Sequence, residues 1–321
     1  MLSCVPWTVG CRRVSSGPTS AHLITVVIPV FNREATIAPA VRSALREADE
    51  SLRVIVVDDG SNDGTAGVVA SIGDERVALL QQENRGVSAA RNRGWRAASS
   101  EYVTFLDSDD SFLPGWWSEV SAACRGGQAD LWSCAAQFRH RDGRLTLEAP
   151  EPLGSAFGGL TAKFLAGTFV VRRNMLVSCG GYLDGLRHGE NSALGIALGE
   201  HLSGEARVAF TNVPLVEVDR RSYPYDAELL DESGTRLLQV YGHRLALDPK
   251  VSATMRTVAG WAAVRNGRRR VGVLLLWSSW RLDPWSGKRL ARLIVGLVRP
   301  SDRSLGGVRR RLRRTGAQRN P

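Results

Sequence analysis

VTFLDSDD, residues 103–110, joins an apolar run to three carboxylates within four positions. Successive side chains of an extended chain point to opposite sides, so Asp107 and Asp109 can converge on one point. Two like charges held that close are costly unless a cation neutralises them. Mg²⁺ and Mn²⁺ take oxygen ligands of this kind and commonly share them with substrate phosphates. Taken alone, the cluster favours a solvated acidic turn, and the elements before it decide between the two interpretations.

Apolar, β-branched segments alternate with helical patterns throughout the first third of the chain. Buried strands are predicted at residues 23–31, 52–57, 77–80 and 102–106. Helices are predicted from apolar spacing over residues 37–48, after a cap at Asp63 or Thr65, and over residues 87–98. Strands and helices that alternate over short connections predict an α/β fold with a parallel, doubly wound sheet.

Polar turns follow three of these strands. They are Pro29 to Asn32, Asp58 to Ser61 and Asp107 to Asp110, with Pro29 expected at a strand end because proline cannot donate to a central ladder. Open α/β sheets bind ligands beyond the carboxyl ends of their strands, so three turns on one rim indicate a binding site. No GxGxxG follows the first strand and no Walker lysine loop is present, which argues against the usual dinucleotide and P-loop sites.

Beyond residue 160 the pattern is looser. A strand is predicted at residues 167–172, a short helix at 173–179 ended by Gly180-Gly181, a helix at 190–202, and strands at 208–210 and 215–218. From residue 227 onward the pattern is helical, with apolar stretches at 258–264 and 274–280. A soft boundary is therefore placed near residue 225.

The net charge of +10 is concentrated at the C-terminus. Residues 251–321 carry 17 Arg and Lys against two acids, Asp283 and Asp302, a balance of +15, so residues 1–250 balance at −5. Nearly all these basic residues are arginines, which pair well with phosphate. The segment could dock on anionic lipid or another acidic partner. A solvated, partly disordered terminus is the alternative.

Cysteine usage and hydropathy bear on the compartment. Five cysteines without CxxC spacing argue against a disulfide framework or a zinc site and predict a reducing, cytoplasmic environment. No run of 18 apolar residues occurs, so no bilayer-spanning helix is expected. Residues 1–20 are rich in Ser, Gly and Pro and do not form a convincing signal peptide. They are interpreted as a loose leader or an over-extended start.

Five ordered segments carry a family resemblance. They are VIPVFN at 27–32, VVDDGSNDGT at 56–65, NRGVSAARNRG at 84–94, YVTFLDSDD at 102–110, and GGYLD at 180–184 followed by GEN at 189–191. The set resembles the family 2 glycosyltransferases, the inverting class with a GT-A fold, over roughly residues 24–202. Each segment could arise by chance, whereas the ordered set is specific.

The resemblance implies a GT-A-type, doubly wound and mostly parallel sheet with flanking helices, plus a C-terminal helical extension. We expect a leader over residues 1–20, a GT-A domain over 21–225, a helical subdomain over 226–298 and a basic, disordered tail over 299–321. Within the GT-A domain, residues 21–112 would bind the nucleotide and residues 113–225 the acceptor.

For the nucleotide, the resemblance implies a wall beneath the base formed by Pro29, Phe31 and Asn32. An apolar floor with nearby backbone donors suits a flat heterocycle, although Phe31 could simply pack in the core. Asp59, and less firmly Asp58, is implied as the carboxylate that reads the base or ribose. An Asx turn at the following glycine is an alternative that is compatible with that role.

For the diphosphate, the resemblance implies Arg91, whose guanidinium could pair with phosphate or with the metal-binding carboxylates. A surface arginine on an amphipathic helix is the alternative. Asp107 and Asp109 match the DxD motif and are implied to hold a divalent cation, Mg²⁺ or Mn²⁺, that bridges the diphosphate, with Asp107 also facing the nucleotide. Asp110 could instead cap a helix that begins near Pro114. Trp116 and Trp117 are expected in the core.

Inverting transfer needs a base that takes the proton of the acceptor hydroxyl. The family supplies it from a Glu-Asp pair, most often from the second member, whereas this chain has Glu190-Asn191. Because an amide cannot accept a proton at neutral pH, Glu190 is the candidate base. Another residue, or lost activity, is the alternative. Glu190 could also serve the helix dipole, His188 is a weaker candidate base, and Asp184 is expected to organise its loop.

We therefore expect a metal-dependent inverting glycosyltransferase. It would move a sugar from a nucleoside diphosphate sugar to a carbohydrate or lipid-linked acceptor in cell-envelope polysaccharide or glycolipid assembly. A transferase-fold scaffold that binds nucleotide without chemistry is the alternative that Asn191 motivates. A sugar-phosphate nucleotidyltransferase is a third, but it requires a glycine-rich loop where this chain has Phe31-Asn-Arg-Glu34.

No nucleic-acid partner is expected. The basic C-terminus is a candidate for peripheral association at the inner face of the plasma membrane. The helices that carry Trp277, Trp280 and Trp285 could lie on a membrane. A packed subdomain with its tryptophans inside is preferred.

Overall fold

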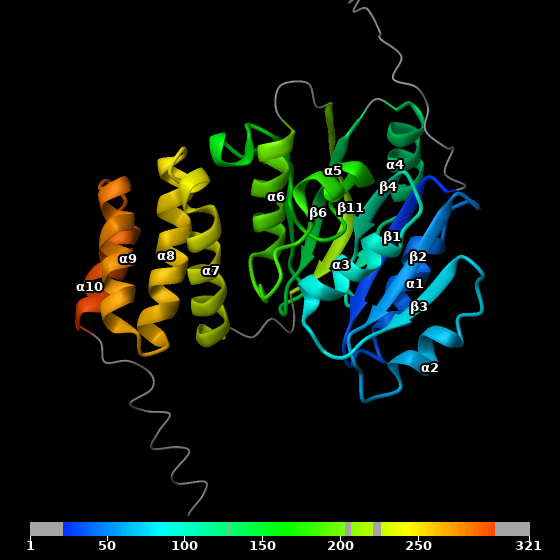
Figure 1. Ribbon diagram of the computed structural model, residues 1–321, viewed down its shortest axis with the longest axis horizontal. Helices are drawn as coiled ribbons and strands as arrows, with labels where there is room; N and C mark the ends of the chain where they lie inside the picture. The colour runs from blue at the N-terminus through cyan, green and yellow to red at the C-terminus, as the bar shows by residue number, and fades with distance from the viewer. Residues whose placement is uncertain (1–21, 128, 203–206, 221–225, 299–321) are drawn as a thin grey trace, which may run out of the picture.

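The computed structural model describes residues 22–127, 129–202, 207–220 and 226–298. The predicted leader over residues 1–20 and the predicted tail over residues 299–321 lie outside these ranges. Within them, a central sheet with helices on both faces is followed by a row of four C-terminal helices, which Figure 1 shows at the left of the molecule.

The N-terminal half of the sheet is parallel, as predicted. Its strands lie in the order β3-β2-β1-β4. Their bounds are β1 Ile24–Val30, β2 Leu52–Asp58, β3 Val77–Gln81 and β4 Tyr102–Phe105. The connecting helices are α1 Ile37–Leu45, α2 Thr65–Ala70 and α3 Val87–Ala97. Pro29 pairs with Val57 of β2, but β4 pairs with β1 only as far as Val27, so the proline lies past the end of that ladder.

The C-terminal half makes the sheet as a whole mixed. Strand β10, Phe169–Arg172, lies between β4 and β6, Leu131–Arg139, and runs antiparallel to both. The two strands predicted at 208–210 and 215–218 are one strand, β11, Val208–Asp219, which pairs parallel with β6. Its register shifts on both sides of Pro214, where the proline interrupts the ladder. The shorter strands are β5 Ser111–Phe112, β7 Leu145–Glu148, β8 Glu151–Pro152 and β9 Thr161–Ala162.

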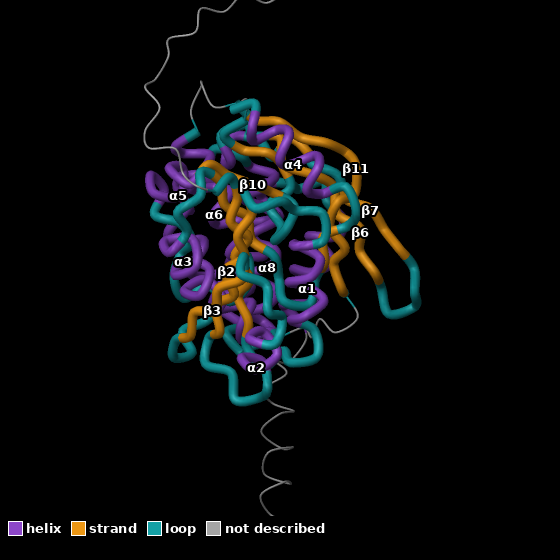
Figure 2. Tube along the Cα trace, turned by 90° about the vertical axis from the view of Figure 1, so that its right-hand side faces the viewer, coloured by secondary structure: helices purple, strands orange, loops and turns teal. Residues whose placement is uncertain are grey.

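Helices cover both faces of the sheet because its central strands are apolar on both sides. In β1, Ile28 packs in a cluster with α1 and α4, Trp116–Arg125, whereas Val27 packs in a second cluster on the opposite face. That second cluster contains residues of α3, of α5, Arg173–Cys179, and of α6, Glu190–His201. Figure 2 shows α3, α5 and α6 on one side of the strands and α1 and α4 on the other. Trp116 and Trp117 are buried in the first cluster, as predicted.

The C-terminal segment forms the helices that the sequence predicts, although the division into domains stays a prediction. The helices are α7 Ala227–Leu245, α8 Pro249–Arg265, α9 Arg269–Leu282 and α10 Gly287–Val298, and η1 Ser155–Phe157 lies against α7. Leu237 and Leu245 of α7 join Ile196 of α6 in one apolar cluster, which fixes the bundle against the sheet domain. Within the described residues, no helix qualifies as a membrane-spanning segment.

The expectation of buried tryptophans is wrong for two of the three. Trp280 is half-buried, but Trp277 is 45% exposed and Trp285 is 95% exposed. Trp277 lies under the guanidinium of Arg281, 4.9 Å from its ring centroid. Trp285 lies in the connection from α9 to α10, where no helix covers it.

Candidate active site

The turns after β1 and β2 are joined by hydrogen bonds across the rim of the sheet. The backbone amide of Asn32 donates to Ser61 Oγ (2.9 Å), and Asn62 N donates back to Asn32 Oδ1 (2.8 Å). Arg33 N donates to Thr65 Oγ1 at 2.9 Å. Asn32 has φ = 52°, a left-handed conformation that asparagine tolerates better than most residues. Phe31 is 41% exposed at this rim, so its alternative interpretation as a core residue is wrong.

Asp58 at the end of β2 and Asp59 after it accept hydrogen bonds from different loops. Asp58 accepts from Ser61 N (2.9 Å), so Asp58, rather than Asp59, closes the turn on its own loop. Asp59 is 4% exposed and accepts from Gln82 Nε2, Arg85 N and Gly86 N at 2.7–2.8 Å. Asp59 therefore fixes the loop that leads into α3. Its part in reading a base stays a prediction.

The third turn carries the DxD carboxylates. Burial and the neighbouring Asp107 raise the pKa of Asp109, whereas nearby Arg33 lowers it. Strands β2 and β4 both pair parallel with β1, so the turns that follow the three strands lie at the same edge of the sheet. The prediction that the three polar turns share one rim is thus confirmed.

Asp110 does not cap a helix, contrary to one sequence expectation. Gly115 occupies the N-cap position of α4, in a left-handed conformation, and makes no side-chain capping bond. Asp110 is buried, and its Oδ1 accepts from Asp219 N (2.9 Å) at the end of β11. Burial, then Asp107 and the other nearby carboxylates, raise the pKa of Asp110 well above its ordinary value. Asp219 adds to this field and was missed in the sequence, because only the pairing of β11 brings it here.

Arg91 connects the DxD turn to the start of α6. Its guanidinium is 1% exposed, donates to Asp107 Oδ1 (2.5 Å) and Glu190 Oε1 (3.0 Å), and lies 5.1 Å from the ring centroid of Tyr182. Burial lowers the pKa of Arg91, but the Asp107 and Glu190 carboxylates outweigh burial and raise it. The interpretation as a surface arginine is wrong, and its pairing with a DxD carboxylate is confirmed.

Close packing of α3 puts Arg91 in reach of both carboxylates. A Cβ on Gly94 would lie 2.3 Å from Val27 Cγ1, so only glycine lets the helix approach β1 this closely.

Glu190 is the first residue of α6, as predicted, and its side chain is 14% exposed. Among the described residues, its hydrogen bonds from Arg91 Nη1 and Asn191 Nδ2 (3.4 Å) both use Oε1. This leaves Oε2 to accept a proton. Asn191 is buried and accepts from the Tyr182 hydroxyl at 2.9 Å. Asn191 is therefore a hydrogen-bonding neighbour of the candidate base.

Asn92 continues this network on the far side of Tyr182. Its Nδ2 donates to Tyr182 O (2.8 Å) and to Asp184 Oδ1 (3.0 Å), so Asp184 organises its loop as expected. Its Oδ1 accepts from Tyr182 N (2.9 Å) and from Trp95 Nε1 (2.9 Å). Asn92 and Tyr182 lie within the motif segments at 84–94 and 180–184, but no role was predicted for either residue. Their buried contacts could not be seen there.

The carboxylates offer an incomplete metal site by themselves. In the part of the chain that the structure describes, no group of three or more His, Cys, Asp or Glu side chains could hold a metal ion. The donor chemistry fits a hard cation in part, because burial and then the charge of Asp107 raise the pKa values of Asp109 and Asp110, and a cation would offset both effects. Further oxygen ligands would have to come from water or a bound phosphate.

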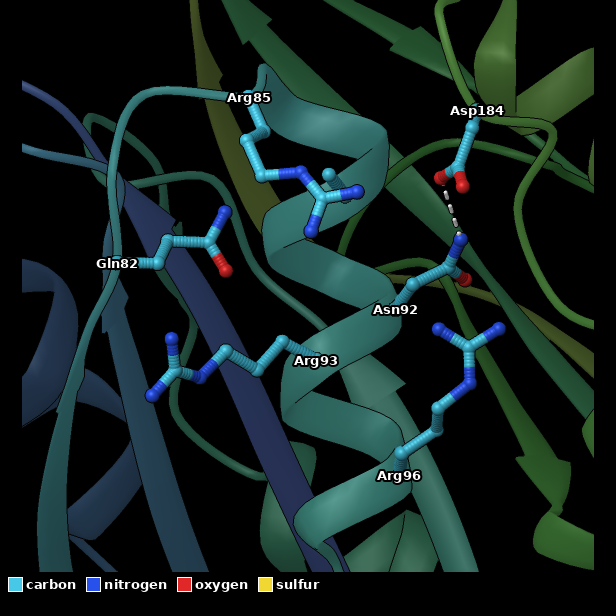
Figure 3. Close-up of a pocket in the computed structure, with 7 residues that line it drawn as sticks. Gln82, Arg85, Asn92, Arg93, Arg96 and Asp184 are labelled. Atoms are coloured by element: carbon cyan, nitrogen blue, oxygen red, sulfur yellow. Dashed lines mark hydrogen bonds between the residues drawn. The ribbon is translucent and has the colours of Figure 1, made fainter.

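A separate recess lies on the outer face of α3. It has a volume of about 290 Å³. Figure 3 shows Arg85, Arg93 and Arg96 around this face, with Asn92 hydrogen-bonded to Asp184 at one flank. Its full lining is Gln82, Arg85, Ala89, Asn92, Arg93, Arg96 and Asp184. The DxD carboxylates and Glu190 do not line this recess.

Part of the chain is similar to known proteins. Residues 25–179 match the family model described as Glycosyl transferase family 2. Over 130 residues, the chain is 32% identical to the GalNAc(5)-diNAcBac-PP-undecaprenol beta-1,3-glucosyltransferase of Campylobacter jejuni, which is 39% of this chain and 41% of that protein. Over 92 residues it is 42% identical to the succinoglycan biosynthesis protein ExoO of Rhizobium meliloti, 28% of this chain and 26% of that protein.

These matches are partial. The matched segment covers 13% of the length of Glycosyltransferase GlyA of Streptococcus pneumoniae and 41% of the length of the C. jejuni protein. Among solved structures, residues 1–349 of S. aureus TarS align with a TM-score of 0.59 at 16% identity over 85% of this chain and 88% of that chain. The same protein in complex with UDP-GlcNAc gives a TM-score of 0.58, with 85% of this chain and 89% of that chain covered. At this identity the structural likeness shows the fold, a mixed central sheet with flanking helices.

Proposed function

Residues 25–179 belong to the family 2 glycosyltransferases, and on that premise we propose that this protein transfers a sugar from a nucleoside diphosphate sugar to an acceptor hydroxyl with inversion at the anomeric carbon. The observation that carries the proposal is the Asp107–Arg91–Glu190 bridge. It holds a DxD carboxylate and a candidate base at opposite ends of one buried guanidinium. Transfer needs a group at the leaving phosphate and a base at the acceptor, and the bridge provides both.

Glu190 is proposed as the base. The acceptor oxygen forms a bond to the anomeric carbon while the bond from that carbon to the diphosphate oxygen breaks. The hydroxyl proton passes to Glu190 Oε2, the oxygen that no described residue occupies. Arg91 and Asn191 hold Oε1 and so fix the orientation of the carboxylate.

Arg91, Asp107 and Asp109 are proposed at the diphosphate. A divalent cation, Mg²⁺ or Mn²⁺, held by Asp107 and Asp109 would supply positive charge at the leaving phosphate. Arg91 lies on the other side of Asp107 and is permanently charged, so it favours the same negative charge. The raised pKa of Asp109 supports this placement, because it reflects negative charge that burial and Asp107 disfavour.

The rim formed by Pro29, Phe31 and Asn32 is proposed to receive the nucleotide base. Exposure of Phe31 supports this, because an aromatic ring at the end of a buried strand offers a face for stacking. Asp59 is proposed to act beside them, with its carboxylate already anchored to Arg85 N and Gly86 N. Solved TarS structures include complexes with UDP-GlcNAc and UDP, which supports a nucleoside diphosphate sugar donor.

Assembly of cell-envelope polysaccharide or glycolipid is the proposed setting. The names of the C. jejuni and R. meliloti relatives, which refer to an undecaprenol-linked acceptor and to succinoglycan, support it. We propose a carbohydrate or lipid-linked acceptor, a cytoplasmic location and peripheral association with anionic membrane through the basic C-terminus. Exposed apolar side chains on α9 and α10, among them Leu274 and Ile294, support that association.

A panel of nucleoside diphosphate sugars, assayed for hydrolysis with and without Mn²⁺, tests the proposal. We expect metal-dependent release of nucleoside diphosphate from at least one donor. Glu190→Gln keeps the size and one acceptor oxygen, so it should abolish transfer and leave nucleotide affinity within about twofold. Asp109→Ala should weaken metal-supported binding. Full turnover by Glu190→Gln would remove that residue from the mechanism.

The second candidate function is a nucleotide-binding scaffold without catalysis. It is favoured by one observation, the buried Asn191 beside Glu190, because an amide cannot take a proton from the acceptor at neutral pH. Calorimetry with nucleoside diphosphates separates the two functions when run beside the hydrolysis panel. Binding without turnover of any donor or acceptor would favour the scaffold.

A further inference from the structure

The recess on α3 is a basic site that the transfer chemistry does not use. Arg85, Arg93 and Arg96 line it and are exposed. Among the described residues, no carboxylate pairs with any of the three, and Asp184, the one acid in the lining, accepts from Asn92. Arg96 is braced by its stacking over Trp95, 5.0 Å from the ring centroid. Arg96 also donates to Gly180 O at 3.5 Å. Guanidinium groups that have no carboxylate partner can bind a multivalent oxyanion.

The recess lies away from the diphosphate end of the proposed donor site, although Gln82 and Arg85 in its lining donate to Asp59 of the proposed base site. Arg91 and Arg93 are two positions apart on α3, about 200° around the helix at 3.6 residues per turn. Arg91 reaches Asp107 and Glu190, so Arg93 points away from them. The recess and the Asp107–Arg91–Glu190 bridge therefore lie on opposite sides of one helix, on the order of 10–12 Å apart.

A short segment nevertheless leads from the recess to the candidate base. Asp184 lines the recess, and the chain runs from there through Leu186 to Glu190 at the start of α6. Ser88 of α3 donates to Leu186 O at 2.9 Å, which holds this segment against the helix. A ligand that extends along it could place one end at Glu190 and the other among the arginines.

We propose that the recess binds a phosphate or diphosphate group carried by the acceptor, at a distance from the hydroxyl that is glycosylated. This rests on the proposed function. Three guanidinium groups give bidentate donors to phosphate oxygens. Gln82 and Asn92 add amides to the lining. A phosphorylated acceptor would thus be anchored at α3 while its free hydroxyl reaches Glu190.

Arginine modification mapped by mass spectrometry tests the site with inorganic pyrophosphate as the probe. Phenylglyoxal should modify Arg85, Arg93 and Arg96 in the full chain, and millimolar pyrophosphate should protect them. Arg42, exposed on α1 across the sheet, is the control and should stay reactive. A nucleoside diphosphate with Mg²⁺ should instead protect Arg33, at the donor rim. Protection of Arg33 by the nucleoside diphosphate, together with no protection of the three recess arginines by pyrophosphate, would overturn the recess and leave the donor site standing.

Matched variants separate the recess from the chemistry. Arg93→Gln/Arg96→Gln should bind pyrophosphate at least about tenfold more weakly, because two charge-assisted contacts are lost. Donor hydrolysis should be unchanged, and Arg42→Gln should change neither. Protection of the recess by anionic vesicles but not by pyrophosphate would contradict a phosphate-group site and indicate a membrane-facing surface. Equal pyrophosphate affinity in the double variant would also contradict the proposal.

Discussion

Arg91 is the residue on which the geometry of the candidate active site depends. It is fully buried, yet it carries a permanent charge, so it is tolerated only because Asp107 and Glu190 compensate it. The two ion pairs of Arg91 hold Asp107 and Glu190 close together, although these residues are 83 positions apart in the sequence. The same contact that stabilises the fold thus sets the distance between the DxD turn and the candidate base.

Replacing Arg91 with glutamine should destabilise the protein by about 3 kcal/mol. The substitution leaves two carboxylates without their cation, and Asp107, being 35% exposed, can recover only part of its hydration. Urea denaturation measures the loss. Arg93→Gln, on the same helix but exposed, is the matched control and should stay within about 0.5 kcal/mol of wild type. Arg91→Gln/Asp107→Asn should regain part of the loss, and strict additivity would contradict the bridge.

Asp110 predicts a pH-dependent change in stability. Burial and Asp107 raise its pKa in the folded state above the unfolded value near 3.8, so the folded state holds the proton more tightly. Ionisation of Asp110 therefore lowers the free energy of unfolding as the pH rises above 3.8. Well below pH 3.8 the carboxyl is protonated in both states and has no such effect. Asp110→Asn, whose Oδ1 can still accept from Asp219 N, should raise the unfolding free energy by about 1 kcal/mol at pH 7.

The gain from Asp110→Asn should disappear near pH 2.5, where the carboxyl is protonated in both states. Asp142→Asn is the control. Asp142 is exposed, and the Arg144 backbone amide lowers its pKa, so its substitution should bring no gain at pH 7. A gain of equal size at both pH values for Asp110→Asn would contradict the electrostatic cause.

The DxD turn and Glu190 could be predicted from the sequence, because strand ends and motif spacing are local features of the chain. Burial of Arg91 and anchoring of Asp59 are not local, since their partners lie 16 to 99 positions away. Asp219 could not be predicted as part of the site for the same reason. Its carboxylate joins the others only through the pairing of β11 with β5 and β6.

At the scale of elements, the close approach of α3 to β1 determines where Arg91 lies. Gly94→Ala would put a methyl group 2.3 Å from Val27 Cγ1, so α3 must move outward. We expect a loss of about 1–3 kcal/mol in urea denaturation and a fall in donor turnover as Arg91 shifts. Gly67→Ala in α2, where no atom lies within 4 Å, should instead gain up to about 1 kcal/mol. Equal effects at both positions would contradict the packing argument.

The elements of the N-terminal half were predictable because each strand there is a continuous apolar run between helical patterns. Strand β6 was not predicted, although Leu131–Arg139 is the partner of both β10 and β11. Its sequence, LWSCAAQFR, mixes small, polar and aromatic residues without a clear period, and its burial follows from its central place in the sheet. In β11, the sequence TNVP is typical of a turn, so two strands were predicted where the structure has one.

At the scale of the whole molecule, charge and exposed apolar surface lie at the same end of the chain. Residues 251–321 balance at +15, and α9 and α10 expose apolar side chains on their outer surfaces. Arg269 at the start of α9 donates to Gly296 O near the end of α10, so the two helices pack side by side and run antiparallel. The exposed apolar residues there include Leu274, Trp277, Trp285, Leu290, Ile294 and Leu297.

Anionic vesicles should therefore capture the protein in flotation experiments at low salt, whereas neutral vesicles should not. Apolar side chains enter the interface while arginines pair with headgroups, each contributing about 1 kcal/mol near the surface. Trp277→Ser/Ile294→Ser and truncation after Val298, which removes eight arginines and one acid, should each reduce capture at least tenfold. Leu147→Ser, exposed on β7, is the control and should float as wild type does. Undiminished capture of the truncated double variant would exclude this end of the molecule as the membrane contact.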